Sequence, residues 1–178
     1  MSRVHQLNPT PKTVHWGHFD ASIPPVLEIE SGDTVIIDTV SGGRQEVTDD
    51  RWFRDDHRII VDQVVQSMGP HILTGPVAVK GAQPGDTLEI CIESIELTAD
   101  WGWNIIRPLK GALPEQFSRL SRRIIPIDRS AGLARLPWGV DVPLQPFFGI
   151  MGVAPPAHYG RVSSIEPREY GGNIDCKE

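Results

Sequence analysis

The chain has 178 residues, with 17 Lys and Arg against 23 Asp and Glu, which gives a formal net charge of −6 at pH 7. This acidic balance argues against a nucleic-acid-binding protein, because phosphate recognition needs clustered basic side chains. No apolar run approaches the roughly 20 residues of a membrane span, and the polar start of the chain lacks the apolar segment of a secretory signal. We therefore expect a cytoplasmic protein that binds neither nucleic acid nor membrane.

Domain organisation follows from length and from the cysteine content. The two cysteines, Cys91 and Cys176, are too few for a disulfide framework and fit a reducing compartment. Residues 1–13 form a polar N-terminal lead. Residues 14–178 are enough for a single domain with its own core, and no linker interrupts them.

Short β-strands dominate the predicted structure, because 17 Gly and 16 Pro are spread along the chain as turn residues. Strands are predicted over 26–30 and 34–38, on either side of a Ser-Gly-Asp turn. The same order returns at 76–80 and 87–97, around a Pro-Gly-Asp turn. Apolar and charged residues alternate in 87–97, and the slip at Ser94 predicts a bulge. The repeated order indicates a duplicated hairpin.

Helices are expected at two places between these strands. A short one is predicted near 62–67, within a polar excursion, and another over 113–123, where an acidic start and a basic end suit the helix dipole. Further along, the apolar, Gly-punctuated run 147–153 predicts a buried strand. The expected fold is therefore mainly β, with short strands and hairpins in a β-sandwich or barrel-like domain and one or two short helices.

The first candidate site is the segment His15-Trp16-Gly17-His18-Phe19-Asp20. His and Asp are natural ligands of zinc and similar ions. In an extended segment His18 and Asp20 point to one face, whereas His15 points to the other face unless Gly17 breaks the register. The alternative is a surface loop without a ligand, because an N-terminal His-x-x-His more often lies in such a loop than in a metal site.

The second candidate site places His71 and Thr74 among Gly and Pro residues, directly before a predicted strand. Gly and Pro fix an unusual backbone shape, which is a common way to hold polar groups beside a ligand. The alternative is a tight turn in which His71 hydrogen-bonds a carbonyl group. Residue types alone favour the turn.

The third candidate site is Tyr170-Gly171-Gly172-Asn173-Ile174-Asp175. The two glycines let the backbone come close to a ligand. Asn173 and Asp175 then offer an amide and a carboxylate on one face of an extended segment. The alternative is a Gly-Gly turn whose Asn tolerates a positive φ.

A thiol nucleophile is a weaker hypothesis, because a catalytic cysteine needs a base and a lowered pKa. Cys91 lies between Ile90 and Ile92 in the predicted strand, and Cys176 lies near the chain end.

Trp103 and its neighbour Trp101 could line an apolar pocket, although aromatic residues more often belong to the core.

Taken in chain order, these segments resemble the acetamidase/formamidase family over residues 14–175. The matching segments are 18–20 with 24–35, 73–79 with 81–86, Trp101-Gly102-Trp103, Gly149–Pro155 and Tyr170–Asp175. The resemblance implies a β-rich amidase, a hydrolase of carbon–nitrogen bonds that cleaves small linear amides such as formamide and acetamide. It also implies a divalent metal, with zinc as the first candidate, that assists the attack of water and the release of ammonia.

The resemblance also assigns roles to residues of this sequence. Asp175 is expected to be a metal ligand and catalytic, with Asn173 supporting it. The further expected metal ligands are His18, Asp20 and His71. The expected substrate-binding residues are Thr74, Gly171, Gly172 and Trp103.

One departure from the family pattern affects the expected activity. Family members continue into a second half that holds another His- and acid-rich motif, and nothing after Asp175 matches it. We therefore expect a chain truncated at its C-terminus that assembles as a homo-oligomer or with a complementary C-terminal half. The alternative function is a non-catalytic β-domain, or a subunit of a split enzyme that needs a second half for activity.

Overall fold

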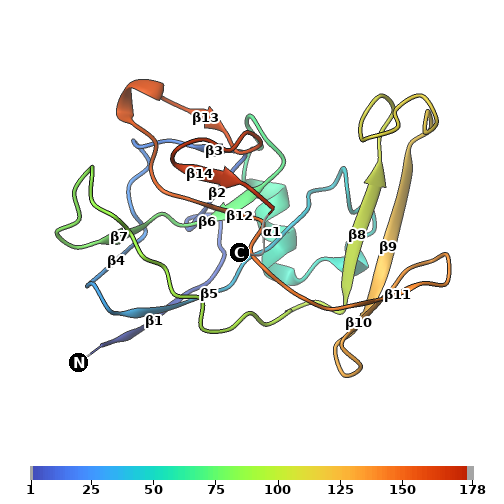
Figure 1. Ribbon diagram of the computed structural model, residues 1–178, viewed down its shortest axis with the longest axis horizontal. Coiled ribbons are helices and arrows are strands. Elements are labelled where there is room, and N and C mark those ends of the chain that lie inside the picture. The colour runs from blue at the N-terminus through green and yellow to red at the C-terminus, as the bar shows by residue number, and fades with distance from the viewer. Residues whose placement is uncertain (1, 176–178) are drawn as a thin grey trace. The chain divides into compact units, whose positions relative to one another are not determined.

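The computed structural model describes residues 2–175, which are mainly β, as the sequence predicted (Figure 1). They contain 14 short strands, one α-helix and two 3-10 turns. The strands of this range form small sheets, and none of the sheets closes into a barrel. None of its helices has the length and apolar character needed to cross a membrane.

The chain separates into two compact units. Unit 1 comprises Met1–Gly43, Phe53–Cys91 and Phe148–Glu178, and unit 2 comprises Arg44–Trp52 and Ile92–Phe147. Each unit is therefore built from stretches that are separated in the sequence.

Unit 1 consists of strand pairs whose members are far apart in the sequence (Figure 1). Two pairs are parallel: β1 (Val4–Leu7) with β5 (Thr34–Ile37), and β4 (Leu27–Ile29) with β7 (Val77–Val79). Three pairs are antiparallel: β2 (Val14–Trp16) with β6 (Ile72–Thr74), β3 (His18–Phe19) with β13 (Val162–Ser163), and β12 (Ile150–Gly152) with β14 (Gly171–Asn173). The 3-10 turn η2 (Ala157–Tyr159) precedes β13.

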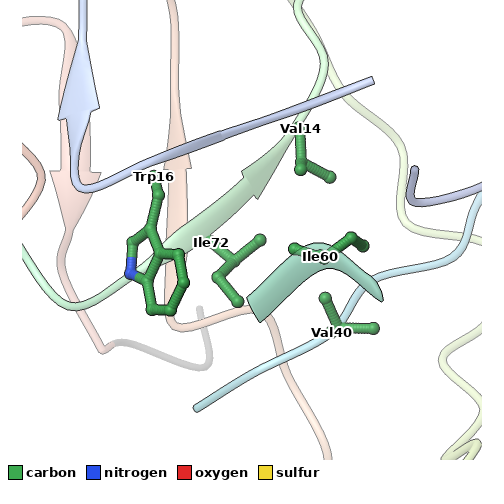
Figure 2. Close-up of a cluster of buried hydrophobic side chains, with 5 residues drawn as sticks. All are labelled: Val14, Trp16, Val40, Ile60 and Ile72. Carbon is green, nitrogen blue, oxygen red and sulfur yellow. The ribbon is translucent and has the colours of Figure 1, made fainter. Parts of the chain in front are cut away.

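The core of unit 1 lies between the β2–β6 pair and the helix α1 (Asp55–Gln63). Ile60 on this helix has no exposed surface, and it packs with Val14, Trp16, Val40 and Ile72 (Figure 2). Burying a side chain of this size stabilises a fold by about 1.5–3 kcal/mol. Helix α1 and strand β6 thus hold β2, and the segment that follows it, in place.

Unit 2 is a four-stranded antiparallel sheet in the order β11-β10-β9-β8. Its strands are β8 (Trp101–Ile106), β9 (Ser121–Asp128), β10 (Leu133–Arg135) and β11 (Asp141–Pro143). The 3-10 turn η1 (Asp50–Trp52) places Trp52 against Trp101, with ring centroids 5.8 Å apart. Nearby, the carboxylate of Glu46 is buried and paired with Arg107.

The predicted duplicated hairpin is wrong. β4 and β5 do not pair with each other, because each is taken up by a parallel partner from elsewhere in unit 1. The predicted strand 87–97 is also wrong: this segment has no regular structure, and Leu88, Ile90 and Ile92 are each about half exposed, at 49%, 52% and 50%. Alternation produces a strand only where a partner strand is available, and no other described residue pairs with this segment.

Both helix predictions also need correction. The observed helix α1 spans Asp55–Gln63, so it begins before the predicted range 62–67 and overlaps only its first two residues. The expected helix at 113–123 is wrong: turns occupy its first part, and β9 begins at Ser121 and pairs with β8. The β-branched Ile124 and Ile125 favour this strand, and cross-strand pairing overrides the charge pattern. The run 147–153 does contain β12, but Met151 within it is exposed rather than buried.

Candidate functional site

The strands β2 and β3 are separated by Gly17, whose φ of +88° belongs to the left-handed region. This turn breaks the strand register, so the rings of His15 and His18 meet, with centroids 5.5 Å apart and planes at 60°. A side chain at position 17 would overlap the backbone of Gly69. Glycine is therefore required here twice over, by the backbone conformation and by the close approach.

His18 is buried, and its hydrogen bonds define its tautomer. Its Nδ1 lies 3.1 Å from the carbonyl oxygen of Trp16 and 2.6 Å from Oγ of Ser67. The Ser67 hydroxyl itself donates to the same carbonyl at 2.8 Å. A carbonyl oxygen only accepts hydrogen bonds, so Nδ1 of His18 carries the proton. In the neutral ring the lone pair is then on Nε2, which makes no hydrogen bond with the described residues.

His15 presents the opposite ring nitrogen. Its Nδ1 is buried and has no hydrogen-bond partner among residues 2–175. Burial lowers the pKa of His15 to about 4, and the neighbouring His18 ring acts in the same direction. The Gly75 backbone and the Asp20 carboxylate oppose this shift. His15 is consequently neutral near pH 7, with an unused nitrogen lone pair.

Asp20 adds a negative charge beside the two rings. Its Oδ1 accepts hydrogen bonds from the backbone N–H of Ser22 at 2.8 Å and from the hydroxyl of Ser22 at 2.6 Å. Its Oδ2 lies 3.7 Å from Nε of Arg161. The Ser22 hydroxyl and backbone N–H, with a smaller contribution from Arg161, lower the pKa of Asp20. Asp20 is thus an ionised carboxylate at neutral pH and acts electrostatically on both histidines.

A second layer of contacts fixes this arrangement from behind. The Gly17 N–H donates to the carbonyl of His71 at 2.8 Å, and the fully buried Ser164 donates its N–H to the carbonyl of Gly17 at 3.0 Å. Oγ of Ser164 lies 2.9 Å from Nδ1 of His71. A side chain at Gly69 would overlap this hydroxyl. The ring of the predicted ligand His71 thus contacts the hydroxyl of Ser164 through Nδ1.

The Gly-Gly motif of the third candidate site lies close to the first. Tyr170 packs on Phe19, between His18 and Asp20 in the sequence, with ring centroids 5.6 Å apart. A Cβ at Gly172 would come within 3.8 Å of the same Phe19 ring. The closest approach of this backbone is to other protein backbone, because a Cβ at Gly171 would lie 2.5 Å from the carbonyl oxygen of Met151.

The polar residues of that motif are engaged elsewhere. Asn173 donates from Nδ2 to the carbonyl of Ile165 at 3.3 Å. Asp175 is exposed, and its backbone N–H donates to the carbonyl of Gly149 at 3.0 Å. Within the described part of the chain, no hydrogen bond or ion pair joins Asp175 to His18 or Asp20. Their convergence on one metal stays a prediction.

The remaining predicted residues are spread over both units. Thr74 lies on β6, where its hydroxyl donates to the carbonyl of Asp38 at 3.4 Å. Trp103 lies on β8 and belongs to unit 2, whereas the other predicted site residues belong to unit 1. Cys91 is exposed, and Cys176 lies outside the described residues.

The side chains around Gly17 offer few ligands for a divalent metal. Residues 2–175 contain no group of three or more His, Cys, Asp or Glu placed to hold a metal ion. They do contain two imidazole lone pairs, on His15 and His18, with the Asp20 carboxylate beside them. Two imidazole donors are fewer than the three protein ligands of an open catalytic zinc site, so a complete site would need a further ligand from outside residues 2–175. Sequence reasoning left His15 out because strand alternation points it away, although Gly17 was the signal that could have included it.

Comparison with known proteins gives consistent results. A profile described as the Acetamidase/Formamidase family matches residues 5–162. Over 138 residues the chain is 26% identical to a protein named "Putative formamidase C869.04" from Schizosaccharomyces pombe. The matched region covers 75% of this chain and 32% of that protein.

Two solved structures share the fold. The first is a recombinant predicted acetamidase/formamidase from the thermophile Thermoanaerobacter tengcongensis, with a TM-score of 0.76, 23% identity, and coverage of 97% of this chain and 52% of that chain. The second is an acetamidase from Bacillus halodurans, with a TM-score of 0.65, 26% identity, and coverage of 97% and 53%. The chain thus spans about half the length of these solved relatives.

Proposed function

The chain belongs to the acetamidase/formamidase family, and on this basis we propose that it contributes to the hydrolysis of small linear amides to a carboxylate and ammonia. The observation that carries the proposal is the family match over residues 5–162. That match includes the His15–His18–Asp20 cluster and His71, whereas it ends before the Gly171–Asp175 motif. The cluster is therefore the better supported part of the candidate site.

We propose a divalent metal, with zinc as the first candidate, because neutral imidazole nitrogens suit zinc better than they suit magnesium or calcium. Among the predicted ligands, His18 supplies a free lone pair and Asp20 a carboxylate. When bound, such a cation supplies the Lewis acidity that polarises an amide carbonyl and lowers the pKa of water. His71 and Asp175 are less well supported as ligands, because they contact Ser164 and the Gly149 region respectively.

The residues of this chain perform simpler tasks in the proposed reaction. Ser67 and the Trp16 carbonyl hold the His18 ring in one tautomer. The Asp20 carboxylate is kept ionised by Ser22, so it balances positive charge rather than donating a proton. The acid that protonates the leaving nitrogen must then come from another group, and the predicted second half is our candidate for its source.

The proposed activity belongs to a longer assembly. The solved relatives are about twice as long as this chain, since it covers 52% and 53% of them. We propose that a complementary C-terminal half, or further copies of the chain, complete the cytoplasmic enzyme. Apolar side chains exposed in unit 1, such as Leu88 and Ile90, support such an association.

A non-catalytic β-domain is the competing proposal. It is favoured by the missing three-ligand group within residues 2–175 and by the partial coverage of the relatives. In that case the chain would keep the family fold as a binding or assembly subunit.

An ammonia-release assay with formamide and acetamide distinguishes the two proposals. We expect the chain alone to self-associate and to release no ammonia, and co-expression with the product of its downstream reading frame to yield a defined complex that does. Size-exclusion chromatography with light scattering reports the association. A defined complex that binds zinc but hydrolyses neither amide would favour the non-catalytic domain.

A further inference from the structure

The sheet of unit 2 has two edges, and one of them is protected against pairing with a further strand. At this edge β11 is three residues long and includes Asp141 and Pro143. The Leu136 N–H donates to the Val140 carbonyl at 2.8 Å, and hydrogen-bonded pairs alternate from there, so Asp141 and Pro143 face outward. A short strand with a charge and with a proline, which lacks an N–H, is a common way to block an edge.

The opposite edge, β8, has none of these protective features. It is six residues long, and among the described strands it is exceeded in length by β9, which lies inside the sheet. No residue from Trp101 to Ile106 is charged or a proline. Among the described strands β8 has β9 as its single neighbour, and it runs beside β9 for its whole length (Figure 1). A long, apolar edge of this kind is a surface for pairing with another chain.

The register of the sheet determines which backbone groups of β8 face outward. The Ile127 N–H donates to the Asp100 carbonyl at 2.8 Å, so these two residues form a hydrogen-bonded pair. Because such pairs alternate along an antiparallel ladder, Trp101, Trp103 and Ile105 turn their N–H and C=O groups away from β9. Within residues 2–175 no backbone hydrogen bond is formed to these outward groups. Three donor–acceptor sets thus face a strand that this copy of the chain does not supply.

From this contrast we propose that two copies of the chain associate through β8, which pairs antiparallel with β8 of the second copy and joins the two sheets into one. The strand is complementary to itself about its centre. The two Trp103 side chains lie opposite each other, and Trp101 of each copy lies opposite Ile105 of the other. Cross-strand pairs of aromatic and β-branched residues stabilise a sheet. A two-fold contact of this type closes on itself, so it gives a dimer.

The charges at the two ends of β8 favour a second copy as the occupant of this edge. Asp100 directly precedes the strand and Arg107 directly follows it. Antiparallel pairing therefore puts the acidic end of one copy beside the basic end of the other, and no charged residue within the strand repels its own copy. Within one copy Asp100 also pairs with Arg129, and Arg107 with Glu46. The charge match consequently selects the orientation of the two strands more than it adds affinity.

The inference goes beyond the proposed hydrolysis of amides, because it concerns an edge of unit 2 and its association is measured without any amide. The two proposals can fail separately. A dimer joined through β8 that lacks amidase activity would count against the proposed function alone. An amidase that stays monomeric would count against this inference alone.

The first experiment uses the full parent chain over a dilution series. Sedimentation velocity should show an equilibrium between monomer and dimer. As the dimer forms, amide hydrogen exchange at Trp101, Trp103 and Ile105, followed by NMR, should slow by about tenfold or more. The Gly102 amide bonds β9 in either state and is the internal reference. The Asp141 amide faces outward at the protected edge and should exchange equally fast at every concentration.

A pair of lysine substitutions tests the two edges against each other. Trp103→Lys puts two ammonium groups opposite each other and removes the aromatic pair, so it should raise the dimer dissociation constant by about tenfold or more. Val142→Lys on β11 is the matched control and should leave that constant within about twofold of the parent value. Circular dichroism melts report whether each variant is folded. The exchange measurement on the parent does not depend on either variant.

Three results would overturn the proposal. The parent could stay monomeric over the whole dilution series, the slowed amides could lie in unit 1 rather than on β8, or Val142→Lys could dissociate the dimer as strongly as Trp103→Lys. A monomeric parent whose β8 amides slow when the product of the downstream reading frame is bound would make that product, and not a second copy, the occupant of the edge.

Discussion

In unit 1 no described strand pairs with the next strand in the sequence, whereas in unit 2 all four strands do. The β3–β13 pair, for example, joins His18 to Ser163, while β8 and β9 pair across a single connection. Distant pairing carries a larger loop-closure cost and slows folding. What unit 1 gains is the meeting of side chains from three separate stretches of chain, and the candidate site is there.

The two units also use glycine differently. In unit 1, Gly17 and Gly69 let two backbone segments touch, and Ser164 fills the remaining space. In unit 2, Gly132 and Gly139 have positive φ angles, but a side chain at either would meet nothing within 4 Å. Glycine in unit 2 thus serves turns, whereas in unit 1 it also serves packing.

The substitution Gly17→Ala should have the largest effect. Its φ of +88° alone costs about 1–3 kcal/mol for a residue with a side chain, and the overlap with the Gly69 backbone adds to that cost. We expect a loss of about 3 kcal/mol or more, measured by urea unfolding, and separation of the His15 and His18 rings. Gly139→Ala in unit 2 is the matched control, because its φ is +86° and its surroundings are open. Equal losses in the two variants would refute the packing role of Gly17.

The core substitution Ile60→Ala should follow in size. Ile60 has no exposed surface, so its truncation leaves a cavity between α1 and the β2–β6 pair, at a cost of about 2–5 kcal/mol. Ile125→Ala on β9 of unit 2 removes an equal volume from a partly exposed position and should cost less. Thermal unfolding followed by circular dichroism compares the two. A greater loss at Ile125 would mean that the stability of the chain depends on unit 2.

The sequence predicts several of the turns and strands, but it does not predict which strands pair with each other. The turn at Ser31–Asp33 and the strand after it were correct, since local propensity fixes both. The partner of β5 is β1, which no pattern in the residues between them indicates. Likewise, His18 and Asp20 could be singled out by residue type. The inclusion of His15 depended on a single backbone angle at Gly17.

Two aspartates make the comparison testable by pH. Hydrogen bonds hold the pKa of Asp33 at about 2, with the backbone N–H of Arg3 as the largest cause and His5 next. The pKa of Asp128 in unit 2 is also about 2, and the Ser130 hydroxyl is the main cause. A depressed carboxyl pKa stabilises the fold fully above about pH 4, and this stability is lost as the pH falls through about 2.

Substitutions of the two aspartates should therefore act over the same pH range, but they should affect different amounts of the surrounding structure. Asp33→Asn removes the charge that strengthens the hydrogen bonds of this turn to Arg3 and to His5 on β1, about thirty residues away. It should therefore speed amide hydrogen exchange along β1 and β5. Asp128→Asn removes the charge from a local turn contact and should affect only the β9–β10 connection. In both variants the difference in urea midpoint from the parent should shrink below about pH 4 and vanish near pH 2. A difference that persists at pH 2 would assign the effect to packing instead.

The smallest effect is expected at Cys91, which lies at the end of one part of unit 1 and far from the Gly17 turn in sequence. Its side chain is exposed, and its closest polar partner is a carboxylate oxygen of Glu89 at 4.0 Å, which is no base poised for a thiol. A thiol nucleophile needs a neighbouring histidine or another means of forming thiolate. Cys91→Ser, made in the proposed amidase complex, should therefore leave ammonia release within twofold of the parent, about 0.4 kcal/mol in activation free energy. His18→Gln in the same complex should abolish that activity. The reverse pattern, with Cys91→Ser inactive but folded, would move the chemistry from the histidine pair to the thiol.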